Sequence, residues 1–146
     1  MRLLTLLAAA LLLTTAAWAA DQGTPDEAPA MAVKAAAYLQ SAGPEKAFAA
    51  FDATQGPWQD RDLYVIVIVL KGVAVARGNL PGLIGKSMID LRDVNGRAFV
   101  QEMVAISDTG WVSYKWQNPI SKTVETKTSY VVRAGDHVVA VGAYTK

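Results

Sequence analysis

Two cationic residues, Arg77 and Lys127, lie in runs of strand-forming residues where they could bind an anion. The planar guanidinium of an arginine can clamp both oxygens of a carboxylate, whereas the ammonium of a lysine acts as a point charge. The alternative for each is a solvated position at the end of a strand. If the two cations form a site, a carboxylate is the ligand that they would favour.

Four aromatic residues could form the apolar wall of such a site, namely Tyr64, Tyr114, Trp116 and Tyr130. Their rings could also donate hydroxyl or indole hydrogen bonds to a ligand, and the alternative for each is ordinary core packing. Side chains alternate between the two faces of a strand, so Tyr114 and Trp116 share a face. By the same rule Lys127 and Tyr130 lie on opposite faces unless a bulge intervenes, and both stay candidates.

Other kinds of chemistry find little support in the residue types. The chain has no cysteine, which excludes thiol nucleophiles and thiolate metal sites. The single histidine, His137, follows Asp136 at an expected turn, which favours a surface position over a catalytic triad. The segment Asp93–Gly96 is similar to half a calcium loop but lacks the remaining ligands. We expect no metal, no cofactor and no enzymatic activity.

The N-terminal 19 residues are typical of a secretory signal peptide. Arg2 precedes a long apolar run, and Ala17-Trp18-Ala19 has the small-x-small pattern of a cleavage site. Cleavage would release a periplasmic protein; the alternative is an uncleaved leader that anchors the chain to the inner membrane. Residues 20–29, with two prolines, are expected to be a flexible segment, and residues 30–146 a single domain.

Charge gives no reason to expect a nucleic-acid partner. Without Arg2 the basic and acidic residues balance at 13 each, and no basic stripe is visible. An exported protein without disulfides must take its stability from its core.

Helices are expected early in the mature chain. Residues 30–40 are rich in alanine, the best helix former, and Pro44 is well placed in the first turn of a second helix. A short helix is expected over residues 98–107, and one helical turn within residues 83–91.

Strands are expected in the rest of the chain. Residues 62–70 are apolar at both alternating positions, which predicts a central strand covered on both faces, with Asp60–Asp62 as its solvated entry. Residues 73–77 follow a Lys-Gly turn and should pair with it. The stretch Trp111–Val132 predicts a hairpin around Asn118-Pro119, and residues 137–144 supply the last strand.

This order of elements predicts an α+β domain. About five strands would form a central antiparallel sheet, with the N-terminal helices on one face and residues 72–107 over the other.

Three segments resemble a known family: GPEKAFAAFD, then DLYVIVIVLKGVAVARGNLPGLIGKSMIDLRDVNGRAFVQEM, then GWVSYKWQNPISKTVETKTSYVVRAGDHVVAVGAY. In this order they resemble the single Cache domain of type 2, a PAS-like extracytoplasmic sensor module of bacterial chemoreceptors and histidine kinases. The resemblance implies a small ligand pocket in front of the sheet and a long helix behind it. It also implies a short organic acid as the ligand, and Lys127 matches the family's lysine before Ser-Tyr.

The sequence therefore predicts a periplasmic, chemotaxis-related sensory domain that binds a short organic acid. The last strand ends close to Lys146, so the signal is expected to pass to a separate partner, such as a membrane receptor, a kinase or a transporter component. The alternative is a structural or interaction module of the same fold that binds no ligand.

Overall fold

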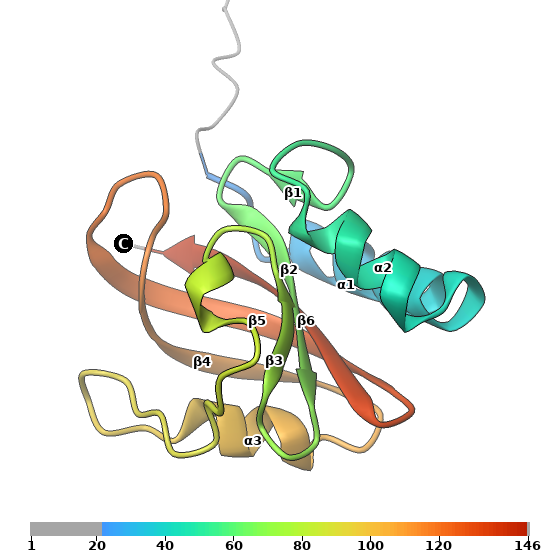
Figure 1. Ribbon diagram of the computed structural model, residues 1–146. Helices are drawn as coiled ribbons and strands as arrows, with labels where there is room; N and C mark the ends of the chain where they lie inside the picture. Colours follow the sequence, from blue (N-terminus) through green and yellow to red (C-terminus); the bar gives the residue numbers. More distant parts are fainter. Residues whose placement is uncertain (1–21, 146) are drawn as a thin grey trace, which may run out of the picture.

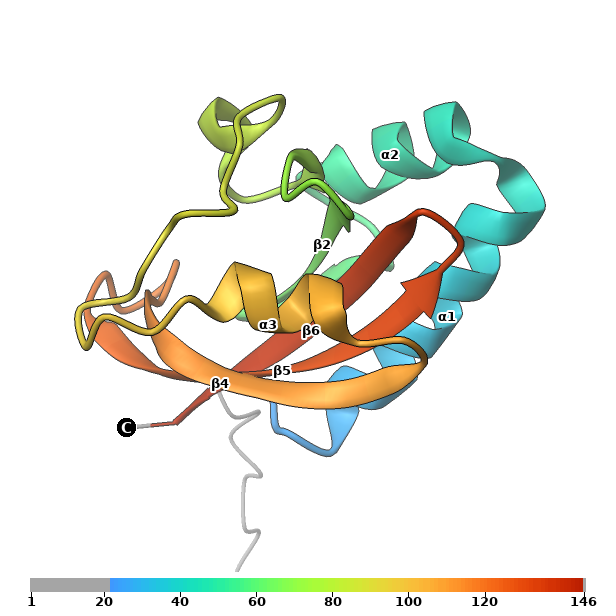
Figure 2. The ribbon, with the colours of Figure 1, turned by 90° about the horizontal axis from the view of Figure 1, so that it is seen from below.

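The computed structural model describes residues 22–145, so the expected signal peptide lies outside the described part. An antiparallel sheet lies between the helices α1 and α2 on one face and α3 on the other (Figures 1 and 2). In chain order the elements are α1 (Glu27–Ala42), α2 (Pro44–Asp52), β1 (Gln59–Asp60), β2 (Leu63–Val69), β3 (Ala74–Arg77), the 3-10 turn η1 (Pro81–Leu83), α3 (Phe99–Ala105), β4 (Thr109–Gln117), β5 (Val124–Ala134) and β6 (His137–Thr145).

The two N-terminal helices form where the composition predicts them. Along α1 the buried residues Ala28, Ala32, Ala35 and Leu39 recur every three or four positions, which places them on one face. Gly43, at a φ of 83°, ends α1, and the next residue is the proline that begins α2. The small alanine side chains let α1 lie close to the sheet.

The sheet follows the order β1-β2-β6-β5-β4, and β3 pairs with β2 beside β1. All pairs are antiparallel, and β4, β5 and β6 form the expected meander. The strand β2 is buried along nearly its whole length, which confirms the prediction of a central strand covered on both faces.

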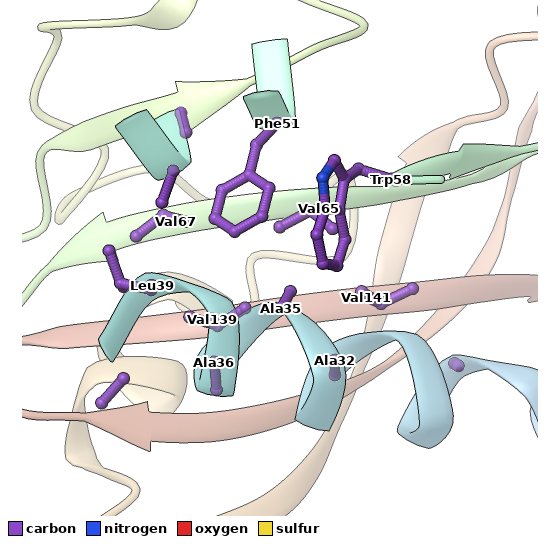
Figure 3. Packing of buried hydrophobic residues seen from close by; sticks show 14 of the residues in the cluster. Ala32, Ala35, Ala36, Leu39, Phe51, Trp58, Val65, Val67, Val139 and Val141 are labelled. Atoms are coloured by element: carbon purple, nitrogen blue, oxygen red, sulfur yellow. The ribbon is translucent and has the colours of Figure 1, made fainter. Parts of the chain in front are cut away.

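Two apolar clusters occupy the two faces of the sheet. On the face of α1 and α2, the rings of Phe51 and Trp58 pack against Val65 and Val141 (Figure 3). On the opposite face, residues of α3 and of the preceding loop pack against the sheet, among them Phe99, Met88 and Met103. The second cluster is the one that contains tyrosines from several strands.

Several boundaries differ from the sequence-based expectation. α1 begins at Glu27, whose carboxylate accepts the backbone N–H of Thr24 at 2.7 Å, so the end of the expected flexible segment 20–29 is helical. The helical turn expected within residues 83–91 lies earlier, at η1. The short strand β1 brings the number of strands to six among the described residues.

The interpretation of Asp60–Asp62 as a solvated strand entry is wrong for Asp62. This residue is fully buried, and its carboxylate accepts the backbone N–H of Gly23 at 2.6 Å and the side-chain amide of Asn118 at 3.1 Å. A buried carboxylate needs such donors, and neither could be inferred from the sequence because both are distant along the chain.

Candidate functional site

Lys127 is fully buried in the middle of β5, on the sheet face that carries α3. Its Nζ lies 3.7 Å from the ring centroid of Tyr64 on β2 and 5.0 Å from that of Tyr144 on β6. No hydrogen-bond acceptor contacts this Nζ within residues 22–145. The ammonium thus lies against the aromatic rings of Tyr64 and Tyr144, and no carboxylate accepts from it among the described residues.

Arg77, the last residue of β3, is the second buried cation, with 2% of its surface exposed. Its backbone N–H donates to the carboxylate of Asp52 at 2.6 Å, which fixes the end of the strand. The guanidinium carbon lies 5.1 Å from the ring centroid of Trp116 and 5.8 Å from that of Tyr64. Its Nη2 donates to the Tyr64 hydroxyl at a long 3.5 Å, and its Nε has no acceptor in the described part of the chain.

The Tyr64 ring is the point at which the two cations meet, and its hydroxyl belongs to a short relay. Tyr144 Oη donates to the carbonyl oxygen of Gln117 at 3.0 Å, and the two tyrosine hydroxyls lie 3.1 Å apart. Since Tyr144 has only one hydroxyl hydrogen, Tyr64 is the donor in this pair. The donors left for an anion therefore come from Arg77 and Lys127.

Aromatic and hydroxyl groups close the cluster towards β4 and α3. The ring of Phe99 stacks on Tyr114 with centroids 4.1 Å apart, and Trp116 meets Phe99 edge-on at 5.5 Å. Tyr114 Oη and Ser129 Oγ form a buried hydrogen bond of 3.2 Å. A surface groove of about 280 Å³ also has Trp116 in its lining, so the ring that contacts Arg77 borders the surface as well.

Burial and the two positive charges shift the pKa values of the cluster. Burial lowers the pKa of Lys127 to about 8, with Tyr64 acting against this shift and the charge of Arg77 adding to it. Burial alone would raise the pKa of Tyr64, but the charges of Lys127 and Arg77 lower it to about 8. Burial raises the pKa values of Tyr114 and Tyr144. The cluster thus favours added negative charge next to Tyr64.

Of the six candidates from the sequence, five come together in this cluster: Tyr64, Arg77, Tyr114, Trp116 and Lys127. Tyr130 does not join it. The strand β5 pairs in regular register, so Tyr130 lies on the face of α1, where its ring meets Trp111 at 4.9 Å. The register therefore places Lys127 in the cluster and Tyr130 on the opposite face.

The sequence-based reasoning missed Ser129, Tyr144 and Phe99. Ser129 has the same parity as Lys127 on β5, a signal that could have identified it. Tyr144 is the cross-strand partner of Lys127, which follows only from the register of β5 and β6. Phe99 reaches the cluster from α3, and no local pattern predicts how that helix packs on the sheet.

The other groups weighed in the sequence lie apart from the cluster. The ring of His137, half-buried at the start of β6, packs edge-on against Phe48 at 5.5 Å. Asp93 accepts three backbone N–H groups, from Asn95, Arg97 and Lys115, which hold its loop against β4. Within residues 22–145 no group of three or more His, Cys, Asp or Glu side chains is arranged to hold a metal ion.

Solved structures share this architecture. The chain is similar to the crystal structure of a methyl-accepting chemotaxis protein from Vibrio parahaemolyticus RIMD 2210633, with 21% identity, a TM-score of 0.69 and coverage of 82% of this chain and 86% of that one. It is also similar to a periplasmic sensor domain of a chemotaxis protein, with 24% identity, a TM-score of 0.64 and coverage of 83% and 90%. A third similar structure, described as the basis for carboxylic acid recognition by a Cache chemosensory domain, has 22% identity, a TM-score of 0.65 and coverage of 83% and 88%.

No curated protein matches the sequence. No helix among the described residues is long and apolar enough to cross a membrane. The family model of the single Cache domain 2 matches residues 30–146. Cache domains are extracytoplasmic, ligand-binding sensory domains, a kind of domain that does not catalyse reactions. The chain belongs to the single Cache domain 2 family.

Proposed function

We propose that this chain is an exported sensory domain that binds a short organic acid between Lys127 and Arg77. The observation that carries the proposal is the meeting of two buried cations at the ring of Tyr64, each with a hydrogen-bond donor that finds no acceptor within residues 22–145. A bound carboxylate would supply the missing acceptors and the missing negative charge together.

Energetics favour this occupant. Removing a cation from water without a partner is costly, and two like charges near one ring add mutual repulsion. In the described part of the chain, no carboxylate forms a salt bridge with either Lys127 or Arg77. The surrounding walls of Tyr114, Phe99 and Trp116 suit a short apolar chain attached to the carboxylate. The solved Cache domain described for carboxylic acid recognition supports the same ligand class.

In this proposal the leader directs the chain to the periplasm and is removed there. The bound acid favours one arrangement of the cluster over another, and a separate partner reads the change. The partner would be a membrane receptor, a kinase or a transporter component. Mass spectrometry of the mature protein distinguishes cleavage after Ala19 from an uncleaved leader that tethers the domain to the inner membrane.

The direct test is isothermal titration calorimetry of the mature domain with acetate, propionate, butyrate and succinate. Propylamine serves as a control of matched shape and opposite charge to propionate. Wild type is compared with Lys127→Met, which removes the charge, and with Tyr130→Phe, which changes the opposite sheet face. We expect at least one acid to bind wild type and Tyr130→Phe with equal affinity and Lys127→Met at least about 10-fold more weakly.

An equal affinity for all three proteins would remove Lys127 from the site. Binding of propylamine in preference to every acid would refute the anionic ligand class.

A second candidate function is an interaction module that binds no ligand. The supporting observation is the exposure of Trp111, a residue of β4. This strand lies at one edge of the sheet, and 47% of the surface of Trp111 is exposed. Two results together would favour this function over the first. No acid of the panel would bind, and size-exclusion chromatography would show an oligomer of wild type that Trp111→Ser disrupts.

A further inference from the structure

Gly142 is a glycine in the middle of the buried strand β6, a position where a side chain would ordinarily fit. Its φ is not in the left-handed region, so its backbone does not require glycine. The residues at alternate positions of the same strand, Val138, Ala140 and Tyr144, all place side chains on the same face of the sheet. Glycine weakens a strand and often marks a close approach of another group.

Two side chains of β5 approach Gly142, namely Lys127 and Ser129, and Ser129 Oγ is the nearest atom. A β-carbon added to Gly142 would lie 2.5 Å from Lys127 Cε and 3.0 Å from Lys127 Cγ, and it would meet the Ser129 hydroxyl as well. Both distances are well below the optimal carbon–carbon van der Waals separation of about 3.5–4.0 Å. The lysine stem therefore lies directly over the glycine.

The sheet order explains why this space is needed. Lys127 is on β5, opposite Tyr144, whereas its Nζ contacts the ring of Tyr64 on β2. The strand β6 lies between β5 and β2 (Figure 1). The side chain must therefore cross β6 to bring its charge to the ring that also meets Arg77. Gly142 is the point at which it crosses.

We infer that Gly142 is a positioning residue of the anion site, because its missing side chain opens the path along which Lys127 reaches Tyr64 and Arg77. An alanine at this position would turn the lysine stem away and leave one cation beside Tyr64. The consequence for ligand affinity rests on the proposed function, whereas the steric relation between Gly142 and Lys127 does not.

The steric relation is tested without ligand by a double-mutant cycle on thermal stability. The four mature proteins are wild type, Gly142→Ala, Lys127→Ala and the double variant. We expect Gly142→Ala to lower Tm by at least about 4 °C more in the wild-type background than in the Lys127→Ala background. The contact with Ser129 is present in both backgrounds and cancels in the cycle.

Gly110→Ala on β4 is the matched control. The three atoms nearest to its β-carbon would all belong to Ile106, the first at 3.1 Å, so its effect on Tm should be the same in both backgrounds. The expected coupling would be strongest if Gly142→Ala alone fails to fold while the double variant folds. Equal losses of Tm in both backgrounds, or a double variant that does not fold, would overturn the inference.

A second readout follows the charge itself. The pKa of Tyr64 is lowered to about 8 partly by Lys127, so displacement of the lysine should move the tyrosinate absorbance titration to higher pH in Gly142→Ala. An unchanged titration would show that the ammonium has not moved and would refute the positioning role. With propionate as the probe, Gly142→Ala and Lys127→Ala should weaken binding by the same factor, and the double variant should weaken it no further.

If wild type binds no acid while the Tm cycle shows the expected coupling, the proposed function fails and the positioning of Lys127 stands. If wild type binds propionate while the Tm cycle is additive, the positioning role fails and the proposed function stands.

Discussion

Replacing Lys127 by methionine should make the ligand-free protein more stable and, under the proposed function, weaken its binding of an acid. Methionine keeps an unbranched stem of similar volume that can lie over Gly142, and it removes the buried charge. The pKa of Lys127 falls from 10.5 to about 8 on folding, which corresponds to roughly 3 kcal/mol of unfavourable free energy for the charged form. Relief of that cost should raise Tm by roughly 10 °C for a domain of this size.

The gain in stability should depend on pH in a direction fixed by the lowered pKa. Between about pH 8 and pH 10.5 the unfolded lysine still holds a proton that the folded lysine has released, so raising the pH stabilises the folded wild type. The advantage of Lys127→Met is therefore complete below pH 8 and fades as the pH approaches 10.5. The lowered pKa of Tyr64 acts in the same direction in wild type.

Urea unfolding of both proteins at pH 7 and pH 10 measures this difference. Tyr130→Phe, on the opposite face of the sheet, is the control. Its free energy of unfolding should differ from that of wild type by the same amount at both pH values. The reasoning is refuted if Lys127→Met is less stable than wild type at pH 7. It is equally refuted if the stabilisation is the same at pH 10, because then no lysine proton is released on folding.

Three further changes test neighbouring parts of the structure. Arg77→Lys should weaken acid binding at least about 10-fold in calorimetry, because lysine lacks the planar fork that stacks on an aromatic ring and pairs with both carboxylate oxygens; unchanged affinity would place the acid elsewhere. Asp93→Asn should speed amide hydrogen exchange at Lys115, because the variant loses the carboxylate that accepts this N–H. Wild type should lose the same protection of the Lys115 amide as the pH falls through the pKa of Asp93, which the hydrogen bond from the backbone N–H of Lys115 lowers most. A protected Lys115 amide in the variant would contradict this role. Asn118→Ala should cost roughly 2–3 kcal/mol in urea unfolding because it removes a buried amide that donates to the carboxylate of Asp62, and a loss within error would show that water replaces it.

The sequence was informative about the sheet because each strand carries its own signal. The apolar run of β2 and the alternation along β4 and β5 predict strands, their faces and the hairpin between them. The same alternation shows that Lys127 and Tyr130 cannot share a face, but it cannot say which of the two lies on the face of Arg77 and Tyr64. That choice depends on where α1 packs, and α1 covers the face that carries Tyr130.

The components that the sequence could not supply are those that depend on register between strands. The position of Tyr144 opposite Lys127 and the passage of the Lys127 stem over Gly142 follow from the pairing of β5 with β6. The burial of Asp62 follows from donors that are 39 and 56 residues away along the chain. Such relations involve pairs of residues, whereas propensity and periodicity describe one segment at a time.

The two faces of the sheet differ in the kinds of residue that they bury. The face of α1 has alanine, valine and large aromatic side chains packed closely, and its residues need no ligand to satisfy them. The face of α3 holds two buried cations at an unfavourable free energy that an anion would offset. Because β2, β5 and β6 form part of both faces, the apolar layer also holds Tyr64, Gly142 and Lys127 in register. The apolar layer behind the cluster thus supports the strands that carry the two charges, and under the proposed function the unfavourable energy of these charges is what a bound acid would offset.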